Sequence, residues 1–301
     1  MMIFLCGMMV VAGTACKNEN APEDKTVQKR YLTIKMSDDA AGMPIRRIKD
    51  ATITPEGNTL LAEWTAGDQA TYCNLSRQDE GAPYKGTLTA VSTGVKSDLT
   101  GDVECTADDY LAVVYPANST FQYNDPGTSY TYTFLLSGQD GTLATLATSY
   151  HQVYGRAHVL SVDDKTATAT MDKMQSLLTL CKFSFVEKDH EANGALPINT
   201  LTIAYGGSDS KTNKYPQSAT VTVTNLTENS AAQAVGATPS EALTINADGA
   251  TEVYVALLPE TGTCEYKFTV TNGSGTYTGT ASAWLKKGEY VVATNLRLTQ
   301  Q

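Results

Sequence analysis

The sequence is poor in the residues that build metal centres and disulfide frameworks. It has 3 histidines and 6 cysteines in 301 residues, and the cysteines are scattered singly. Such spacing gives neither the paired ligands of a zinc site nor a dense disulfide pattern. Charged residues make up only 18% of the chain against 42% hydrophobic residues. This balance excludes an intrinsically disordered chain and a coiled coil.

Basic residues are the scarcer of the two charge classes. There are 22 Lys and Arg residues against 32 Asp and Glu, which gives a net charge of −10. An acidic surface repels phosphate backbones, so we expect no nucleic-acid binding. It also argues against electrostatic docking onto anionic lipid.

Catalytic signatures are missing as well. The chain has no G-x-S-x-G, no H-E-x-x-H and no phosphate-cradling loop. His151 and His158 lie seven residues apart, with no carboxylate in helical register. Three acidic pairs occur, at Asp38-Asp39, Asp108-Asp109 and Asp163-Asp164. We interpret them as solvated turns rather than as calcium ligands. We therefore expect no enzymatic activity, no cofactor and no metal.

The N-terminus carries an export signal. Residues 1–15 form an uncharged apolar run, which is shorter than the about 20 residues that span a bilayer. Small residues directly before Cys16 resemble a bacterial lipobox, although Gly13 replaces a larger aliphatic residue and no basic residue precedes the run. We predict a signal peptide over 1–15, lipidation of Cys16, and a polar tether over 16–30.

Four further cysteines lie in the mature chain, at Cys73, Cys105, Cys181 and Cys264. They allow three pairings, which the sequence does not distinguish, and free buried thiols are favoured slightly over a disulfide. Cys181 shares a predicted strand face with Phe183 and Phe185, so it is expected to act as a small buried hydrophobe.

Alternating polar and apolar residues predict β-strands along the whole chain. The clearest strands lie at 31–36, 110–115, 177–185, 253–257, 266–270 and 290–298. One short helix is predicted over 171–178. Turn residues between many strands favour β-sandwiches, and a polar stretch places a domain boundary near residue 165. The predicted fold is all-β, with sandwiches over 31–165 and 166–301.

Several short motifs occur in the order typical of one family. They are Trp64-Thr65-Ala66-Gly67-Asp68, Tyr115-Pro116-Ala117, Leu257-Leu258-Pro259, and Trp284-Leu285-Lys286-Lys287-Gly288-Glu289-Tyr290. Together with the lipoprotein signal, they resemble the fimbrillin family of Bacteroidetes, although Glu289 replaces the family's lysine. The resemblance implies two tandem transthyretin-like β-sandwiches in a subunit of a type V pilus. It also implies an outer-membrane lipoprotein precursor, an arginine-specific processing protease, and other pilus subunits as partners.

The residues suit assembly by strand exchange. Leu32, Ile34 and Met36 lie on one face of the first strand, which would fill a groove between sheets. Removing this strand would expose apolar surface and unpaired backbone groups, which another strand can satisfy. The possible cleavage site is Arg46 and Arg47, for which a solvated loop is the alternative. The expected donor is the C-terminal strand, with Val292, Leu296 and Leu298 on one face together with Tyr290.

The alternative function is a monomeric surface lipoprotein that binds glycan or a host or bacterial surface ligand. Sandwich loops can carry exposed aromatic side chains for that purpose. The candidates are Tyr123, Tyr130 and Tyr132. Trp64 and Trp284 are expected in the core rather than as sugar platforms.

Overall fold

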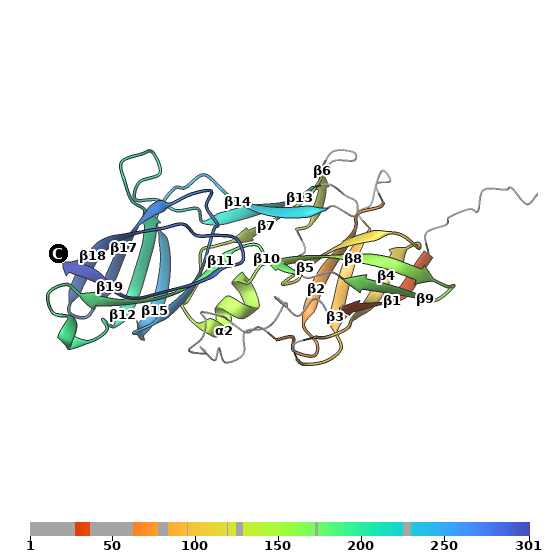
Figure 1. The fold of residues 1–301 in the computed structure, drawn as a ribbon, viewed down its shortest axis with the longest axis horizontal. Helices are drawn as coiled ribbons and strands as arrows, with labels where there is room; N and C mark the ends of the chain where they lie inside the picture. Colours follow the sequence, from red (N-terminus) through yellow and green to blue (C-terminus); the bar gives the residue numbers. More distant parts are fainter. Residues whose placement is uncertain are drawn as a thin grey trace, which may run out of the picture.

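The computed structural model is built almost entirely from β-strands (Figure 1). It describes residues 28–36, 63–77, 84–94, 96–118, 120–124, 129–171, 174–224 and 230–301. The prediction of an all-β chain is confirmed, and strands occur at all six predicted positions.

The first sheet closes on itself like a barrel. Its strands are β1 (Gln28–Met36), β2 (Gln69–Asn74), β3 (Lys85–Ala90), β4 (Leu99–Cys105), β5 (Tyr110–Tyr115), β8 (Val153–Val162), β9 (Thr166–Met171) and β10 (Gln175–Ser176). The order is β10-β8-β5-β2-β3-β4-β1-β9, and a further β8–β9 pairing completes the ring. The prediction divides the chain at residue 165, whereas β9 is hydrogen-bonded to β1 and β8 of this sheet.

The second sheet contains seven strands. They are β11 (Thr179–Glu187), β12 (Ile198–Tyr205), β15 (Leu243–Ala250), β16 (Val253–Leu257), β17 (Cys264–Asn272), β18 (Gly275–Ala283) and β19 (Tyr290–Gln300). Their order is β15-β12-β17-β18-β19-β11-β16. In both sheets, the first strand in sequence lies between an antiparallel strand and a parallel strand: β1 between β4 and β9, and β11 between β16 and β19.

A third sheet joins the two halves of the chain. Its order is β14-β13-β7-β6, with β6 (Gln122–Asn124) and β7 (Ser129–Leu135) from the first half and β13 (Ser218–Thr224) and β14 (Ala231–Gly236) from the second. Figure 1 shows β13 and β14 extending along one side of the molecule between the halves. Pairing between strands so distant in sequence is invisible to local periodicity.

The two hydrophobic cores lie against each other. One fills the barrel, and the other fills the second half. Strands β2, β5 and β8 contribute to both cores, because Cys73, Val114 and Tyr154 belong to the second core while their neighbours face into the barrel. This double burial explains why β5 is apolar on both faces.

The predicted helix over 171–178 is wrong. Met171 ends β9, and Gln175–Ser176 is the short strand β10, which pairs with β8. The apolar residues of this segment divide between the two cores: Met174 lies in the barrel core, and Leu177 lies in the other. The helical turns lie elsewhere, at α2 (Leu143–Thr145), the π-helical η2 (Leu146–Tyr150) and η3 (Glu191–Asn193).

Candidate strand-exchange site

Strand β1 contains Leu32, Ile34 and Met36, the residues of the first strand that are predicted to take part in strand exchange. It pairs antiparallel with β4 and parallel with β9, so both of its edges are hydrogen-bonded. Leu32 lies opposite Gly101 on one side and Ala167 on the other. Without β1, the two neighbouring strands would present unpaired backbone groups along their length.

The apolar face of β1 points into the barrel. Leu32 and Ile34 are completely buried, and Met36 packs at the edge of the same core. On the opposite face of the strand, Tyr31 and Lys35 are exposed to solvent. Full burial of one such aliphatic side chain contributes about 1.5–3 kcal/mol. The strand therefore fills part of the core as well as completing the sheet.

Arg30 anchors the beginning of β1. Its Nε donates to the Asp163 carbonyl oxygen at 2.6 Å, and its Nη1 donates to the Cys105 carbonyl oxygen, also at 2.6 Å. It thereby ties β1 to the β8–β9 turn and to the end of β4. The sequence prediction assigned Arg30 to the polar tether, because a residue so close to a charged segment gives no local sign of long-range pairing.

Asp163 orders the turn that Arg30 contacts. Its carboxylate accepts hydrogen bonds from the Thr166 hydroxyl at 2.6 Å and from the backbone N–H groups of Lys165 and Thr166. These bonds favour the charged form and lower the pKa of Asp163 to about 2. Tyr31, the residue after Arg30, donates its N–H to the Lys165 carbonyl oxygen at 2.9 Å. The turn and the start of β1 therefore form one connected network.

The predicted donor strand lies in the second sheet, away from the barrel core. β19 pairs in parallel with β11 and antiparallel with β18. Leu298 is buried in the second core, while Val292 and Leu296 are partly exposed. Within one chain, therefore, the exchange residues predicted in β1 and those predicted in β19 belong to different sheets.

A bulge interrupts the alternation in β19. Val292 lies opposite Lys182, but Leu296 lies opposite Phe185, so β19 has one extra residue in this interval. Asn295 has a positive φ of 56° there, and its N–H donates to the Ser184 hydroxyl at 2.9 Å. Leu296 and Leu298 consequently lie on the opposite face from Tyr290 and Val292. The predicted single face of four residues is wrong.

Cys16, Arg46 and Arg47 lie outside the described residues. The four cysteines of the described fold are free thiols, and only Cys264 is partly exposed. Burial raises the pKa of Cys73 to about 12 and that of Cys105 to about 11. Burial also raises the pKa of Cys181, which packs as a small hydrophobe.

The aromatic residues considered for ligand binding are placed differently. Tyr130 and Tyr132 are almost completely buried, and the side chain of Tyr123 lies outside the described residues. The Tyr130 hydroxyl donates to the carbonyl oxygens of Asn74 and Arg77, at 3.1 and 3.0 Å, which links β7 to the end of β2. These two tyrosines are therefore structural. Trp64 is buried as expected, whereas Trp284 is half-exposed.

Within the described ranges, no group of three or more His, Cys, Asp or Glu side chains is placed so that it could hold a metal ion. In the same part of the chain, no helix has the length and apolar character needed to cross a membrane.

Comparison with known proteins gives similarity only at the level of solved structures. No model of a known protein family matches the chain, and no curated protein matches it. A structure from Bacteroides uniformis, provisionally described as a cell adhesion protein, is 14% identical with a TM-score of 0.47. That similarity covers 87% of this chain and 99% of the other.

Two further structures carry the same provisional description. The one from Bacteroides eggerthii is 14% identical with a TM-score of 0.37, covering 90% of this chain and 87% of the other. The one from Bacteroides fragilis is 11% identical with a TM-score of 0.38, covering 89% and 93% respectively.

Proposed function

We propose that this protein is a structural or adhesive subunit of a type V pilus, exported as an outer-membrane lipoprotein and assembled by donor-strand exchange. The observation that carries the proposal is the position of β1. It is the first strand of the described chain, it is hydrogen-bonded on both edges, and it inserts Leu32 and Ile34 into the barrel core. An incoming strand can replace such an element because main-chain pairing gives affinity and the alternate side chains give specificity.

The connection after β1 supplies the processing step in this proposal. Residues 37–62 separate β1 from Glu63, the next described residue, and contain Arg46 and Arg47. Cleavage there would detach β1 from the chain and leave its groove for a strand of the neighbouring subunit. The C-terminal segment that contains Val292, Leu296 and Leu298 is the proposed donor, and its donation requires β19 to separate from β11 and β18.

The test is the mature N-terminus, determined by mass spectrometry on native outer membranes and on sheared surface filaments. Material from filaments should begin just after Arg46 or Arg47, and membrane precursor should retain lipidated Cys16. The double variant Arg46→Ala/Arg47→Ala should keep lipidated Cys16 and disappear from filaments. Lys49→Ala, which removes a neighbouring positive charge, should process normally.

One result would contradict the proposal. If only lipidated Cys16 is found, in membranes and with no shorter species in surface filaments, the shaft-subunit proposal fails. The protein would then be an anchor or a stand-alone surface lipoprotein.

A further inference from the structure

Open sheet edges are places where a folded chain can accept another strand, and most edges in the described structure are protected. The Gln139 side chain covers the edge of β16, accepting from the Ala256 N–H at 2.7 Å and donating to the Ala256 carbonyl oxygen at 3.0 Å. The Tyr254 N–H donates to the Gly141 carbonyl oxygen at 2.8 Å. β6 and β10 contain only 3 and 2 residues, and Asp248 distorts β15 with a positive φ of 47°.

The outer edge of β14 has none of these protections along most of its length. The strand reads Ala-Ala-Gln-Ala-Val-Gly, without charge or proline, and Val235 is 57% exposed. Among the strands that the structure describes, it pairs with β13 alone. An uncharged, regular edge of this kind is a template for pairing with another chain.

The register identifies which backbone groups are available. The Ala237 N–H donates to the Ser218 carbonyl oxygen at 2.9 Å, and backbone groups alternate in direction along an antiparallel strand. Ala232, Ala234 and Gly236 therefore direct their N–H and C=O groups away from β13.

One of these outward groups already has a partner from outside the sheet. The Lys287 ammonium donates to the Ala232 carbonyl oxygen at 2.7 Å, which confirms the direction of that edge. Among the described residues, the backbone groups of Ala234 and Gly236 that face outward have no hydrogen-bond partner. Lys287 thus covers one end of β14, whereas the outward groups at the other end lack a described partner; Ala234 there is 8% exposed and Gly236 is half-buried.

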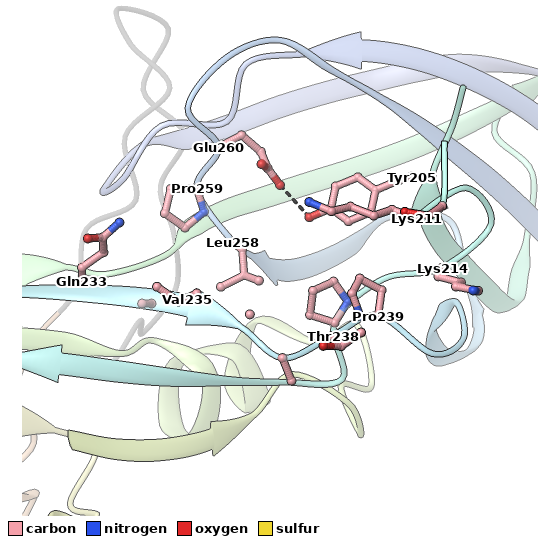
Figure 2. Close-up of a pocket in the computed structure, with 15 residues that line it drawn as sticks. Tyr205, Lys211, Lys214, Gln233, Val235, Thr238, Pro239, Leu258, Pro259 and Glu260 are labelled. Atoms are coloured by element: carbon pink, nitrogen blue, oxygen red, sulfur yellow. Dashed lines mark hydrogen bonds between the residues drawn. The ribbon is translucent and has the colours of Figure 1, made fainter. Parts of the chain in front are cut away.

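A pocket of about 560 Å³ lies beside the open end of β14. Figure 2 shows Gln233 and Val235 on one side of it and Tyr205 and Lys211 on the other. Leu258, with prolines 216, 239 and 259, gives the lining an apolar part. An extended strand that enters here would meet both free backbone groups and apolar side-chain surface.

The charge at this pocket differs from that of the whole chain. Lys211 and Lys214 line it, and neither forms an ion pair with a described residue. Glu260 is the one carboxylate of the lining, and its Oε1 accepts from the Tyr205 hydroxyl at 2.7 Å. Lys211 and Lys214 outnumber Glu260 in the lining, so the pocket is locally positive although the net charge of the chain is −10.

We propose that this groove binds an extended acidic segment of a partner protein, which adds as a fifth strand to β14. Its backbone pairs with Ala234 and Gly236, and its carboxylate side chains lie against Lys211 and Lys214. Main-chain pairing supplies the affinity, and the lysines select for acidic side chains. The site is separate from β1, so it stands whether or not β1 is exchanged.

The test uses the detergent-solubilised full chain and a fluorescein-labelled heptapeptide, Ser-Val-Glu-Val-Glu-Val-Ser, with an amidated C-terminus. Fluorescence anisotropy should give saturable binding. The same peptide with lysines in place of glutamates should bind at least tenfold more weakly. Two further versions of the acidic peptide are N-methylated at alternate amides, one on each backbone edge, and the version methylated on the edge that pairs with β14 should lose binding.

Two variants locate the site. Lys211→Glu/Lys214→Glu should weaken binding at least tenfold, whereas Lys165→Glu, a single charge reversal on the remote β8–β9 turn, should leave it within twofold. Ala234→Pro should also weaken binding at least tenfold. Proline is accommodated on an edge strand where the lost N–H faces outward, so β14 should stay paired with β13, as circular dichroism can verify.

Three results would overturn the proposal. One is the absence of saturable binding by the acidic peptide, and another is equal binding by the acidic and basic peptides. The third is full affinity for the N-methylated peptide in both methylation patterns. This last measurement uses the unaltered chain, so it holds even if Ala234→Pro does not fold.

Discussion

At the scale of single residues, the alternation in β1 separates side chains that stabilise the barrel from side chains that do not. Leu32 is completely buried, and Lys35, three residues later, faces solvent. Leu32→Ala should lower the free energy of unfolding by about 2–5 kcal/mol, because it leaves a cavity among packed neighbours. Urea unfolding of the full chain measures this change.

The matched control is Lys35→Ala, in the same strand. It should change the free energy of unfolding by no more than about 0.5 kcal/mol, because the residue is exposed. Equal effects of the two substitutions would mean that β1 does not occupy the barrel as described.

At the scale of elements, the β8–β9 turn should give part of the stability a pH dependence. Its Asp163 has a pKa of about 2, below the usual value of 3.8. The folded state therefore binds fewer protons, and the contribution of Asp163 is present above pH 3.8 and lost as the pH falls towards 2. Wild type should unfold at higher urea than Asp163→Ala at pH 6, and the difference should shrink between about pH 4 and pH 2.

The adjacent Asp164 provides the comparison. Its carboxylate accepts no hydrogen bond from any residue that the structure describes, so Asp164→Ala should not reproduce the pH-dependent difference. A difference for Asp163→Ala that stays constant from pH 6 to pH 2 would contradict the role of the charged carboxylate.

Individual strands were predictable because burial on one face leaves a period of two in the sequence. β1 and β17 are examples, with polar and apolar residues alternating along each. The bulge in β19 was not predictable, because Asn295 and its contact to Ser184 depend on the register with β11. The helix predicted over 171–178 is wrong for a similar reason, since Met174 and Leu177 pack in two separate cores, which local sequence does not reveal.

The candidate exchange site was only partly visible in the sequence. The buried face of β1 follows from local alternation, whereas Arg30 binds carbonyl groups 75 and 133 residues away. The open edge of β14 was invisible for the same reason, because a strand is an edge only in relation to its neighbours. Long-range pairing supplies these features, and no short segment encodes it.

At the scale of the whole molecule, the shared sheet and the adjoining cores predict that both halves unfold together. β7 pairs with β13 over seven residue pairs, and β2, β5 and β8 contribute to the second core. The chain has 2 tryptophans, the buried Trp64 beside β2 and Trp284 after β18. In Trp284→Phe, the fluorescence of Trp64 should report unfolding at the same urea concentration as circular dichroism of all strands.

Separate transitions in that experiment would show that the halves are thermodynamically independent. The control is the calorimetric test on the unaltered chain, in which the measured and van't Hoff enthalpies should agree. This check does not depend on either tryptophan.

Removing β1 from the chain tests most directly how this strand acts in the whole molecule. A chain that begins at Ile48 lacks β1, so Leu32 and Ile34 no longer fill the core, and the facing edges of β4 and β9 lose their partner. This shortened chain should melt at a lower temperature and self-associate. Adding a synthetic peptide of residues 28–36 should restore a monomer and raise the melting temperature.

The size of that rise follows from linkage, because the peptide binds the folded chain and not the unfolded one. At a concentration of 100 times its Kd, it should contribute about 2.7 kcal/mol, and each kcal/mol raises the Tm of a chain this long by roughly 2–4 °C. The same peptide with Ile34→Asp should give no rise, because it would bury a charge in the barrel. If both peptides act equally, or neither acts, β1 is not a replaceable strand of the barrel, and assembly by exchange at this site is excluded.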